Sequence, residues 1–238
     1  MVGGTRQPAT WKWIMSQNVW TEVDNYICGL LAPNDPALQA TLKASEAAGL
    51  PAIQVSATQG KFLYLLARLM RAGNILELGT LGGYSTIWLA RALPPKGRLI
   101  TVDANPKHTE VARSNVAFAG LSDCVEFRVG PGLAVLPQLA REGRGPFDFI
   151  FIDANKSDMP EYFDWALRFS RSGGLIIADN VIRDGKVLDA SSMDADIQGV
   201  RRFNERLAAE KRVSATELQT VGSKGYDGFA MAVVLADA

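Results

Sequence analysis

The sequence predicts a doubly wound α/β fold, in which a mostly parallel β-sheet is covered by helices on both faces. Short apolar segments alternate with longer segments of helical periodicity from residue 74 to residue 207, as in chains built from repeated strand and helix units. Segment 147–153 (FDFIFID) is almost uninterrupted in its apolar character, which is typical of strands buried on both faces of a parallel sheet. A turn containing glycines, at residues 79–83, leads from the first strand directly into a helix.

The length of 238 residues suits one α/β domain, and no change in composition marks a second one. We therefore expect a single domain over residues 1–238, with a helical segment at 1–52 and a core at 53–238. The formal net charge is zero, so the basic excess of a nucleic-acid-binding protein is missing and a small-molecule ligand is expected. No basic-then-apolar leader and no apolar run of roughly 18–20 residues occur, which predicts a cytoplasmic protein without a membrane partner.

The cysteines and the single histidine give little support to a disulfide, a zinc site or a histidine-dependent hydrolase. Cys28 and Cys124 are far apart and have no C-x-x-C spacing, so we expect free thiols. His108 is the single histidine, and we interpret it as a solvated surface residue of a helix rather than a catalyst. Its isolation also argues against a Ser-His-Asp hydrolase and a histidine-ligated zinc site.

The segment before residue 74 predicts three helices. The first lies within residues 10–31, which carry three tryptophans, and the second runs from Asp35 to Ala48 with Asp35 as N-cap and proline at the first helical position. Residues 53–56 are expected to be extended. The third helix spans residues 58–71, and its buried face is expected to comprise Phe62, Leu65, Leu66 and Leu69.

The remaining elements follow in strict alternation. Strands are predicted at residues 75–78, 98–103, 124–129, 147–153 and 174–179, and helices at 84–93, at 105–119, around Leu133 to Leu139, around Tyr162 to Leu167, and around Ile197 to Leu207. Two extended segments, 212–220 and 228–235, are separated by a turn-like stretch at 222–225. We expect them to form an antiparallel hairpin at the edge of the sheet.

The glycine turn has the outline of a nucleotide site. Gly79, Gly82 and Gly83 allow positive φ and close approach of a ligand, and the helix that follows offers unpaired N–H groups. The spacing is G-x-x-G-G and differs from the dinucleotide pattern G-x-G-x-x-G. A plain strand-to-helix turn therefore stays open as an interpretation of the glycines alone.

Four of the five predicted parallel strands carry an acidic residue at their carboxyl ends, at the edge where open α/β sheets bind ligands. These acidic residues are Glu77, Asp103, Asp153 and Asp179. Asp103 is expected to accept hydrogen bonds from ribose hydroxyls, although it can also cap the helix behind it. Glu77 lies in a strand that is expected to be buried, so its carboxylate needs hydrogen-bond or ionic partners. We expect it to bind the amides of the turn or the cationic end of a ligand.

A second group consists of Asp153, Asp179 and Asn180. If their strands are neighbours, three hard oxygen ligands meet, which suits Mg²⁺, Mn²⁺ or Ca²⁺ and not zinc. Lys156 would then overhang the same site, where a nearby divalent ion and apolar walls disfavour its ammonium form, so it can act as a proton acceptor. The alternative interpretation of Lys156 is an exposed loop lysine.

These motifs together resemble the class I S-adenosylmethionine-dependent methyltransferases, and within them the metal-dependent O-methyltransferases similar to catechol and caffeoyl-coenzyme A O-methyltransferases. The resemblance covers roughly residues 53–234 and rests on four motifs: LELG-x-x-x-GYS at 76–85, IDA-x-K at 152–156, DNV at 179–181 and DGF at 227–229. It implies a Rossmann-like seven-stranded sheet with an antiparallel C-terminal hairpin, and a homodimer.

The resemblance also assigns roles to residues. It implies that six residues bind S-adenosylmethionine: Val55, Gly79, Tyr84, Ser85, Asp103 and Gly132. We add Glu77 and Asp153 to this group of expected cofactor-binding residues. It implies that Asp153, Asp179 and Asn180 hold the metal, and that Lys156 is the catalytic base, with Asp153 beside it in catalysis. Asn155 and Gly132 depart from the acidic residue and the alanine that are usual in the family.

The expected function is transfer of a methyl group to a hydroxyl of a small vicinal dihydroxy aromatic. The alternatives are a nicotinamide-dependent oxidoreductase, which the glycine spacing disfavours, and a non-catalytic Rossmann-like binding protein, for which the metal ligands and the lysine would have no use. The loop at 183–196 and the tryptophans of the amino-terminal segment do not identify the acceptor.

Overall fold

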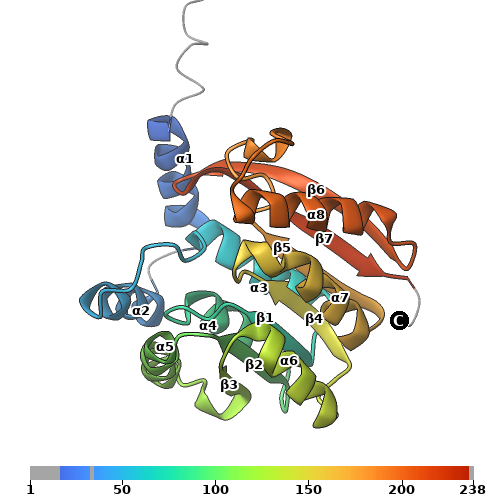
Figure 1. The fold of residues 1–238 in the computed structure, drawn as a ribbon. Helices are drawn as coiled ribbons and strands as arrows, with labels where there is room; N and C mark the ends of the chain where they lie inside the picture. The colour runs from blue at the N-terminus through green and yellow to red at the C-terminus, as the bar shows by residue number, and fades with distance from the viewer. Residues whose placement is uncertain (1–16, 33–34, 236–238) are drawn as a thin grey trace, which may run out of the picture.

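A computed structural model describes residues 17–32 and 35–235 and contains one seven-stranded sheet (Figure 1). Its strand order is β3-β2-β1-β4-β5-β7-β6. The first five strands pair in parallel, whereas β7 pairs antiparallel with both β5 and β6. The strands are β1 (Asn74–Leu78), β2 (Arg98–Asp103), β3 (Val125–Val129), β4 (Phe147–Ile152), β5 (Ser170–Asp179), β6 (Val213–Gly222) and β7 (Gly225–Val234). The predicted seven-stranded sheet with its antiparallel carboxyl-terminal hairpin is confirmed.

Helices cover both faces of this sheet. One face packs against α6 (Gly132–Arg141), α7 (Met159–Phe169) and α8 (Ala195–Ala209), which lie toward the viewer in Figure 1. The other packs against α2 (Pro36–Ala47), α3 (Ala57–Leu69), α4 (Tyr84–Ala90) and α5 (Pro106–Phe118), while α1 (Gln17–Leu31) contacts β6 and α3. Short 3₁₀ turns are η2 (Ser122–Cys124), η3 (Lys156–Asp158) and η4 (Lys186–Leu188). Among the described helices, none combines the length and apolar content needed to cross a bilayer.

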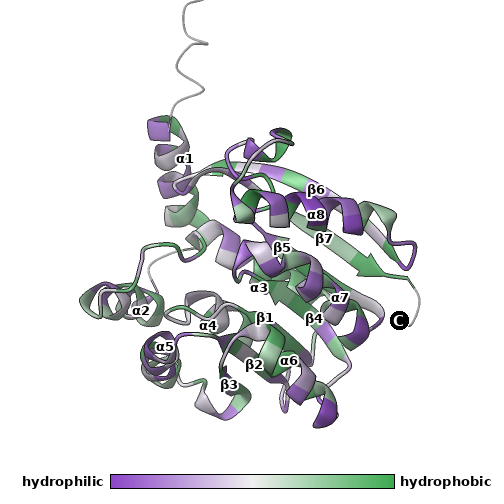
Figure 2. Cartoon of the chain, in the orientation of Figure 1, coloured by the Kyte–Doolittle hydropathy of each residue, from purple (hydrophilic) through white to green (hydrophobic). Residues whose placement is uncertain are grey.

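The central strands are apolar on both sides because each side faces a helical layer. In β4, Phe149 and Phe151 point to the α3–α4 layer, and Ile150 and Ile152 point to the α6–α7 layer; all four are at most 1% exposed. Figure 2 shows the same contrast, with green strands at the centre and purple residues on the outer surfaces of the helices. The parallel strands therefore bring their carboxyl ends together at one edge of a rigid core.

The helices before β1 agree only in part with the sequence prediction. Asp35 caps α2 as expected, since its Oδ1 accepts hydrogen bonds from the amides of residues 37 and 38. The predicted apolar face of α3 is correct only in part: Phe62 and Leu66 pack against the core, but Leu65 and Leu69 are 53% and 81% exposed. Leu63 and Ala67 are the buried residues of this helix. Small residues on the inner face let α3 pack closely against α4, which the apolar count of the sequence does not reveal.

Two other amino-terminal predictions have different outcomes. Residues 53–56 contain a bend at residue 54 and end at Ser56, the N-cap of α3, whose backbone is extended as predicted. The helix expected within residues 10–31 is present as α1 from residue 17, but Trp11, Trp13 and Ile14 lie outside the described residues.

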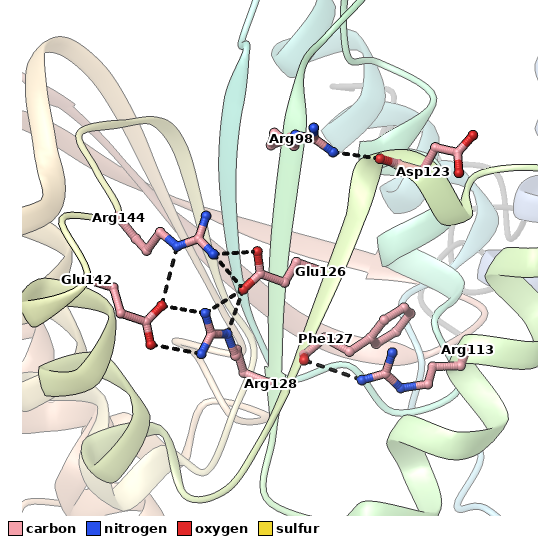
Figure 3. A network of polar contacts seen from close by, with 8 residues as sticks. All are labelled: Arg98, Arg113, Asp123, Glu126, Phe127, Arg128, Glu142 and Arg144. Atoms are coloured by element: carbon pink, nitrogen blue, oxygen red, sulfur yellow. Dashed lines mark hydrogen bonds and ion pairs between the residues drawn. The ribbon is translucent and has the colours of Figure 1, made fainter.

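The outer strand β3 carries a network of ion pairs (Figure 3). The Arg128 guanidinium lies 2.6 Å from Glu126 and also pairs with Glu142, and Arg144 lies 3.0 Å from Glu126 and 3.3 Å from Glu142. Exposed ion pairs of this kind contribute little to stability. Charges on an edge strand oppose pairing with a strand of another chain, so the network protects this edge of the sheet.

A carboxylate is buried in the central strand β1. Glu77 is 0% exposed and accepts hydrogen bonds from three hydroxyls: Ser85 at 2.6 Å, Thr86 at 2.5 Å and Thr101 at 2.7 Å. Thr80 adds a hydroxyl contact of 2.6 Å to Thr101. These bonds join β1 to α4 and β2 and replace the water that the carboxylate loses on burial.

Glu77 should make the stability of the protein depend on pH. Burial is the main cause that raises its pKa from 4.5 to about 7, while the hydroxyl bonds oppose the rise. A group whose pKa is higher in the folded state contributes stability below pH 4.5 and loses that contribution as the pH rises toward 7. Glutamine does not titrate, so the Glu77→Gln variant should not lose stability in this way. The free energy of unfolding of the variant minus that of the wild type should therefore increase between pH 4.5 and pH 7, by on the order of 3 kcal/mol.

Urea unfolding of both proteins over this pH range measures the difference between their free energies of unfolding. The other titrating groups are the same in both proteins, so their contributions cancel in this difference. The exposed Glu46 provides the matched control as Glu46→Gln. A difference between Glu77→Gln and the wild type that stays constant with pH would show that folding does not raise the pKa of Glu77.

Candidate active site

A cavity of about 620 Å³ lies at the carboxyl ends of β1, β2 and β4. Most of the predicted site residues line it: Val55, Gly79, Tyr84, Ser85, Asp103, Gly132, Asp153, Lys156 and Asn180. Glu77 and Asp179 do not belong to its lining. A larger cavity of about 890 Å³ lies at the amino ends of the strands and contains none of the predicted residues. Its arginines Arg98 and Arg113 donate to the backbone carbonyls of residues 123 and 127 (Figure 3).

The glycine turn is held against the end of β4. Gly79 has φ +101°, and a Cβ at this position would lie 2.1 Å from the carbonyl oxygen of Asp153. The Asp153 amide donates to the carbonyl of Leu78 at 2.7 Å. Packing thus accounts for Gly79 without a ligand, and it places the ends of β1 and β4 in direct contact. Leu81, which is not glycine, also has a positive φ of +47°, a strained conformation that the surrounding contacts must maintain.

Asp103 supplies those contacts. Its Oδ2 accepts hydrogen bonds from the amides of Thr80 (3.1 Å) and Leu81 (2.9 Å), and its Oδ1 accepts one from the amide of Asn105 (2.8 Å). The sequence assigned the amides of the turn to Glu77 as one option, and this option is wrong because Asp103 holds them. Glu77 lies beneath the cavity with its oxygens taken by hydroxyls.

His108 differs from its interpretation as a solvated surface residue. Its Nδ1 lies 3.2 Å and 3.3 Å from the two oxygens of Asp103, its side chain is 21% exposed, and it lines the cavity. The sequence signal was its position five residues after Asp103, in the first turns of α5, where a side chain can reach back to the strand end.

Lys156 is buried and paired, so the alternative of an exposed loop lysine is wrong. The residue is 7% exposed, and its Nζ lies 2.9 Å from Asp153 Oδ1. Helix α8 packs directly on η3: a Cβ at Gly199 would lie 2.2 Å from the carbonyl oxygen of Lys156. This close packing excludes water from the lysine stem and fixes Nζ beside the carboxylate.

Asp179 is a buried carboxylate next to this pair. It is 6% exposed, and its Oδ1 accepts a hydrogen bond from the Asn180 amide at 2.9 Å. Burial, and then the charge of Asp153, raise the pKa of Asp179 to about 7, while Lys156 lowers it. Asn180 has φ +61° and lines both the main cavity and a second cavity of about 280 Å³, which also includes Asp179.

The residues present fit a hard divalent cation. Two carboxylates in mutual repulsion, one of them buried, are stabilised by added positive charge, and carboxylate and amide oxygens are ligands of Mg²⁺, Mn²⁺ and Ca²⁺. Within residues 17–32 and 35–235, no group of three or more His, Cys, Asp or Glu side chains is arranged to hold a metal. A cation here would therefore use Asp153, Asp179 and Asn180, and oxygens of water or substrate would complete its coordination.

The two departures from the family pattern, Asn155 and Gly132, both contact Tyr162, a residue that the sequence placed in a helix without a role in the site. Tyr162 donates a hydrogen bond of 2.6 Å to Asn155 Oδ1. Its ring lies 2.7 Å from the position of a Cβ on Gly132. Tyr162 also lines the main cavity, so the glycine at 132 provides the space that this ring occupies. Burial, followed by the charges of Asp158 and Glu161, raises the pKa of Tyr162 to about 12, which keeps its hydroxyl protonated as a donor.

Comparisons with known proteins agree with this geometry. A family model described as O-methyltransferase matches residues 32–232. A catechol O-methyltransferase of Niastella koreensis is 58% identical over 92% of this chain and 100% of the relative, and one of Mycobacterium tuberculosis is 52% identical over 90% and 95%.

Solved structures show the same similarity. The O-methyltransferase from Bacillus cereus in complex with SAH superimposes with a TM-score of 0.91 at 57% identity, covering 92% of this chain and 100% of that one. The O-methyltransferase TomG from Streptomyces achromogenes in complex with SAM gives a TM-score of 0.90 at 52% identity, covering 93% and 100%. The fold, the motif residues gathered at one cavity and the family model lead to one conclusion: this chain belongs to the O-methyltransferase family.

Proposed function

We propose that this O-methyltransferase transfers the methyl group of S-adenosylmethionine to a hydroxyl of a small catechol-like acceptor, and that it depends on a divalent cation. The observation that carries this proposal is the buried Lys156–Asp153 pair beside Asp179 and Asn180. The names of the relatives support the acceptor class, and the SAH and SAM complexes of the similar structures support the cofactor. The family assignment disfavours the oxidoreductase alternative.

The cofactor end of the site would be formed by the glycine turn and Asp103. Asp103 would accept hydrogen bonds from the ribose, and Val55, Tyr84 and Gly132 would enclose the rest of the nucleoside. They line one cavity with Asp153 and Lys156. The methyl group would thus lie between the turn and the acidic cluster, as in-line transfer requires.

The acceptor would lie on the side of Asn180. The cavity of about 280 Å³ beyond it is lined by Phe62 and Phe229 together with Asp179, so it offers apolar walls next to oxygen ligands. A vicinal dihydroxy aromatic matches this combination, since its ring packs against apolar surface and its two oxygens can reach a shared cation.

The chemical step requires removal of one proton from the acceptor hydroxyl. A bound divalent cation supplies positive charge that lowers the pKa of this hydroxyl. Lys156 would enter this step as the neutral amine and accept the proton at Nζ to become the ammonium, while Asp153 orients this nitrogen through the contact of 2.9 Å. The acceptor oxygen forms its bond to the methyl carbon while the carbon–sulfur bond breaks, and the sulfonium becomes a neutral thioether.

We also propose a single domain over residues 1–238 and a homodimer. The described part of α1 has no buried residue in one chain, and its exposed apolar side chains include Val23, Tyr26, Leu30 and Leu31 at 48–70% exposure. An apolar helix surface of this kind favours coverage by a second copy. Light scattering that gives the mass of one chain at micromolar concentration would contradict the dimer.

Substitution Asp153→Asn should separate turnover from cofactor binding. The change keeps the shape of the side chain but removes the charge that holds Lys156 and, in our proposal, the cation. Turnover with Mg²⁺ should decrease at least about a hundredfold, as when a stabilising group is removed from an active site. Binding of S-adenosylhomocysteine, measured by calorimetry, should remain within a few-fold of the wild type.

The exposed Asp184, in the loop after β5, provides a control with the same change of charge as Asp184→Asn. Wild-type turnover in Asp153→Asn would refute the role of Asp153. Loss of S-adenosylhomocysteine binding would instead place this residue mainly at the cofactor.

Substitution Lys156→Met tests the proposed base. Methionine preserves much of the buried apolar stem and removes the amine, so kcat should fall by roughly 10²–10⁴-fold, with a small change in the KM for S-adenosylmethionine. The exposed Lys186 gives the matched control as Lys186→Met. A kcat within a few-fold of the wild type, in a variant with an unchanged melting temperature, would exclude Lys156 as the base.

A further inference from the structure

The carboxylate of Asp103 is fully occupied by donors from the protein. Backbone amides of Thr80 and Leu81 donate to Oδ2, the amide of Asn105 donates to Oδ1, and His108 Nδ1 lies 3.2 Å from Oδ1 and 3.3 Å from Oδ2. A carboxylate has about four lone-pair sites and only accepts hydrogen bonds, so Nδ1 must carry its proton here. Four donors therefore fill four sites.

Three of these donors cannot leave without rearranging the backbone. Thr80 and Leu81 belong to the turn, where Leu81 keeps a positive φ, and Asn105 is the N-cap of α5, whose Oδ1 accepts the amide of Lys107. The fourth donor is a side chain. His108 is partly exposed and lines the cavity, so rotation about its side-chain torsions frees one site on the carboxylate at low cost.

We propose that His108 is a positioning residue whose Nδ1 occupies the acceptor position on the Asp103 carboxylate that a ribose hydroxyl needs. When the nucleoside binds, the imidazole rotates away and the ribose hydroxyl takes this position. The inference rests on the proposed function, because it requires a cofactor whose ribose donates to Asp103. Before binding, the imidazole completes the hydrogen bonds of the carboxylate. The hydrogen bond from one ribose hydroxyl then replaces the bond that His108 already makes, so His108 lowers the affinity for the nucleoside.

Removal of the imidazole should consequently tighten cofactor binding. His108→Ala should bind S-adenosylhomocysteine about two- to tenfold more tightly than the wild type, the effect of one hydrogen bond that no longer competes. His108→Asn keeps a donor that can reach Asp103 and should bind with nearly wild-type affinity. Lys107→Ala is the control, since Lys107 is exposed in the same turn and does not line the cavity.

A spectroscopic signal tests the displacement directly. The chain has one histidine, so an untagged protein gives a single set of imidazole resonances. Saturation with S-adenosylhomocysteine should shift these resonances, because the ring leaves the carboxylate. Weaker binding by His108→Ala, or imidazole resonances that do not move at saturation, would overturn the proposal even if the wild type binds and methylates normally. A wild type that does not bind S-adenosylhomocysteine would refute the proposed function, and the role of His108 with it.

Discussion

The buried carboxylate of Glu77 is the interaction on which the geometry of the glycine turn, the proposed cofactor end of the site, depends. Glu77 is fully buried. Burying a carboxyl group costs free energy unless its oxygens accept hydrogen bonds. Three hydroxyls provide those bonds, and they come from the helix after the turn and from the neighbouring strand β2. The first turn of α4 is therefore fixed relative to β1 and β2, and the loop between β1 and α4 has little freedom. The carboxylate acts on the cavity without being part of its wall.

The turn joins the two halves of the site. On one side Asp103 collects the amides of Thr80 and Leu81, and on the other Gly79 lies against the backbone of Asp153. The same residue, Asp153, extends its side chain to Lys156. Asp153 thus packs against the glycine turn through its backbone and belongs to the acidic cluster through its side chain, so backbone packing sets the distance between the two halves. This continuity is what an in-line transfer between two bound molecules needs.

Local signals in the sequence predicted most of the fold. The strands were recognised from their apolar runs, and the cap at Asp35 from the proline that follows it, because these features depend on neighbours in the chain. The apolar face of α3 was predicted correctly for Phe62 and Leu66 and wrongly for Leu65 and Leu69, since it depends on how closely α4 approaches. The strand ends predicted the edge of the sheet at which the motif residues meet in one cavity. The contact of His108 with Asp103 had a local signal, a spacing of five residues, that the prediction did not use. The burial of Lys156 under α8 and the role of Tyr162 beside Gly132 depend on tertiary packing that no local pattern encodes.

The central claim is that a vicinal pair of hydroxyls and a divalent cation are both required for transfer. The most direct test is a methylation assay that compares catechol with phenol, each with Mg²⁺ and with EDTA. Our account predicts a methylated product from catechol with Mg²⁺ and a rate near background in the other three reactions, because phenol offers one oxygen and EDTA removes the cation. Methylation of phenol at a rate comparable to catechol, or full activity on catechol in EDTA, would contradict it.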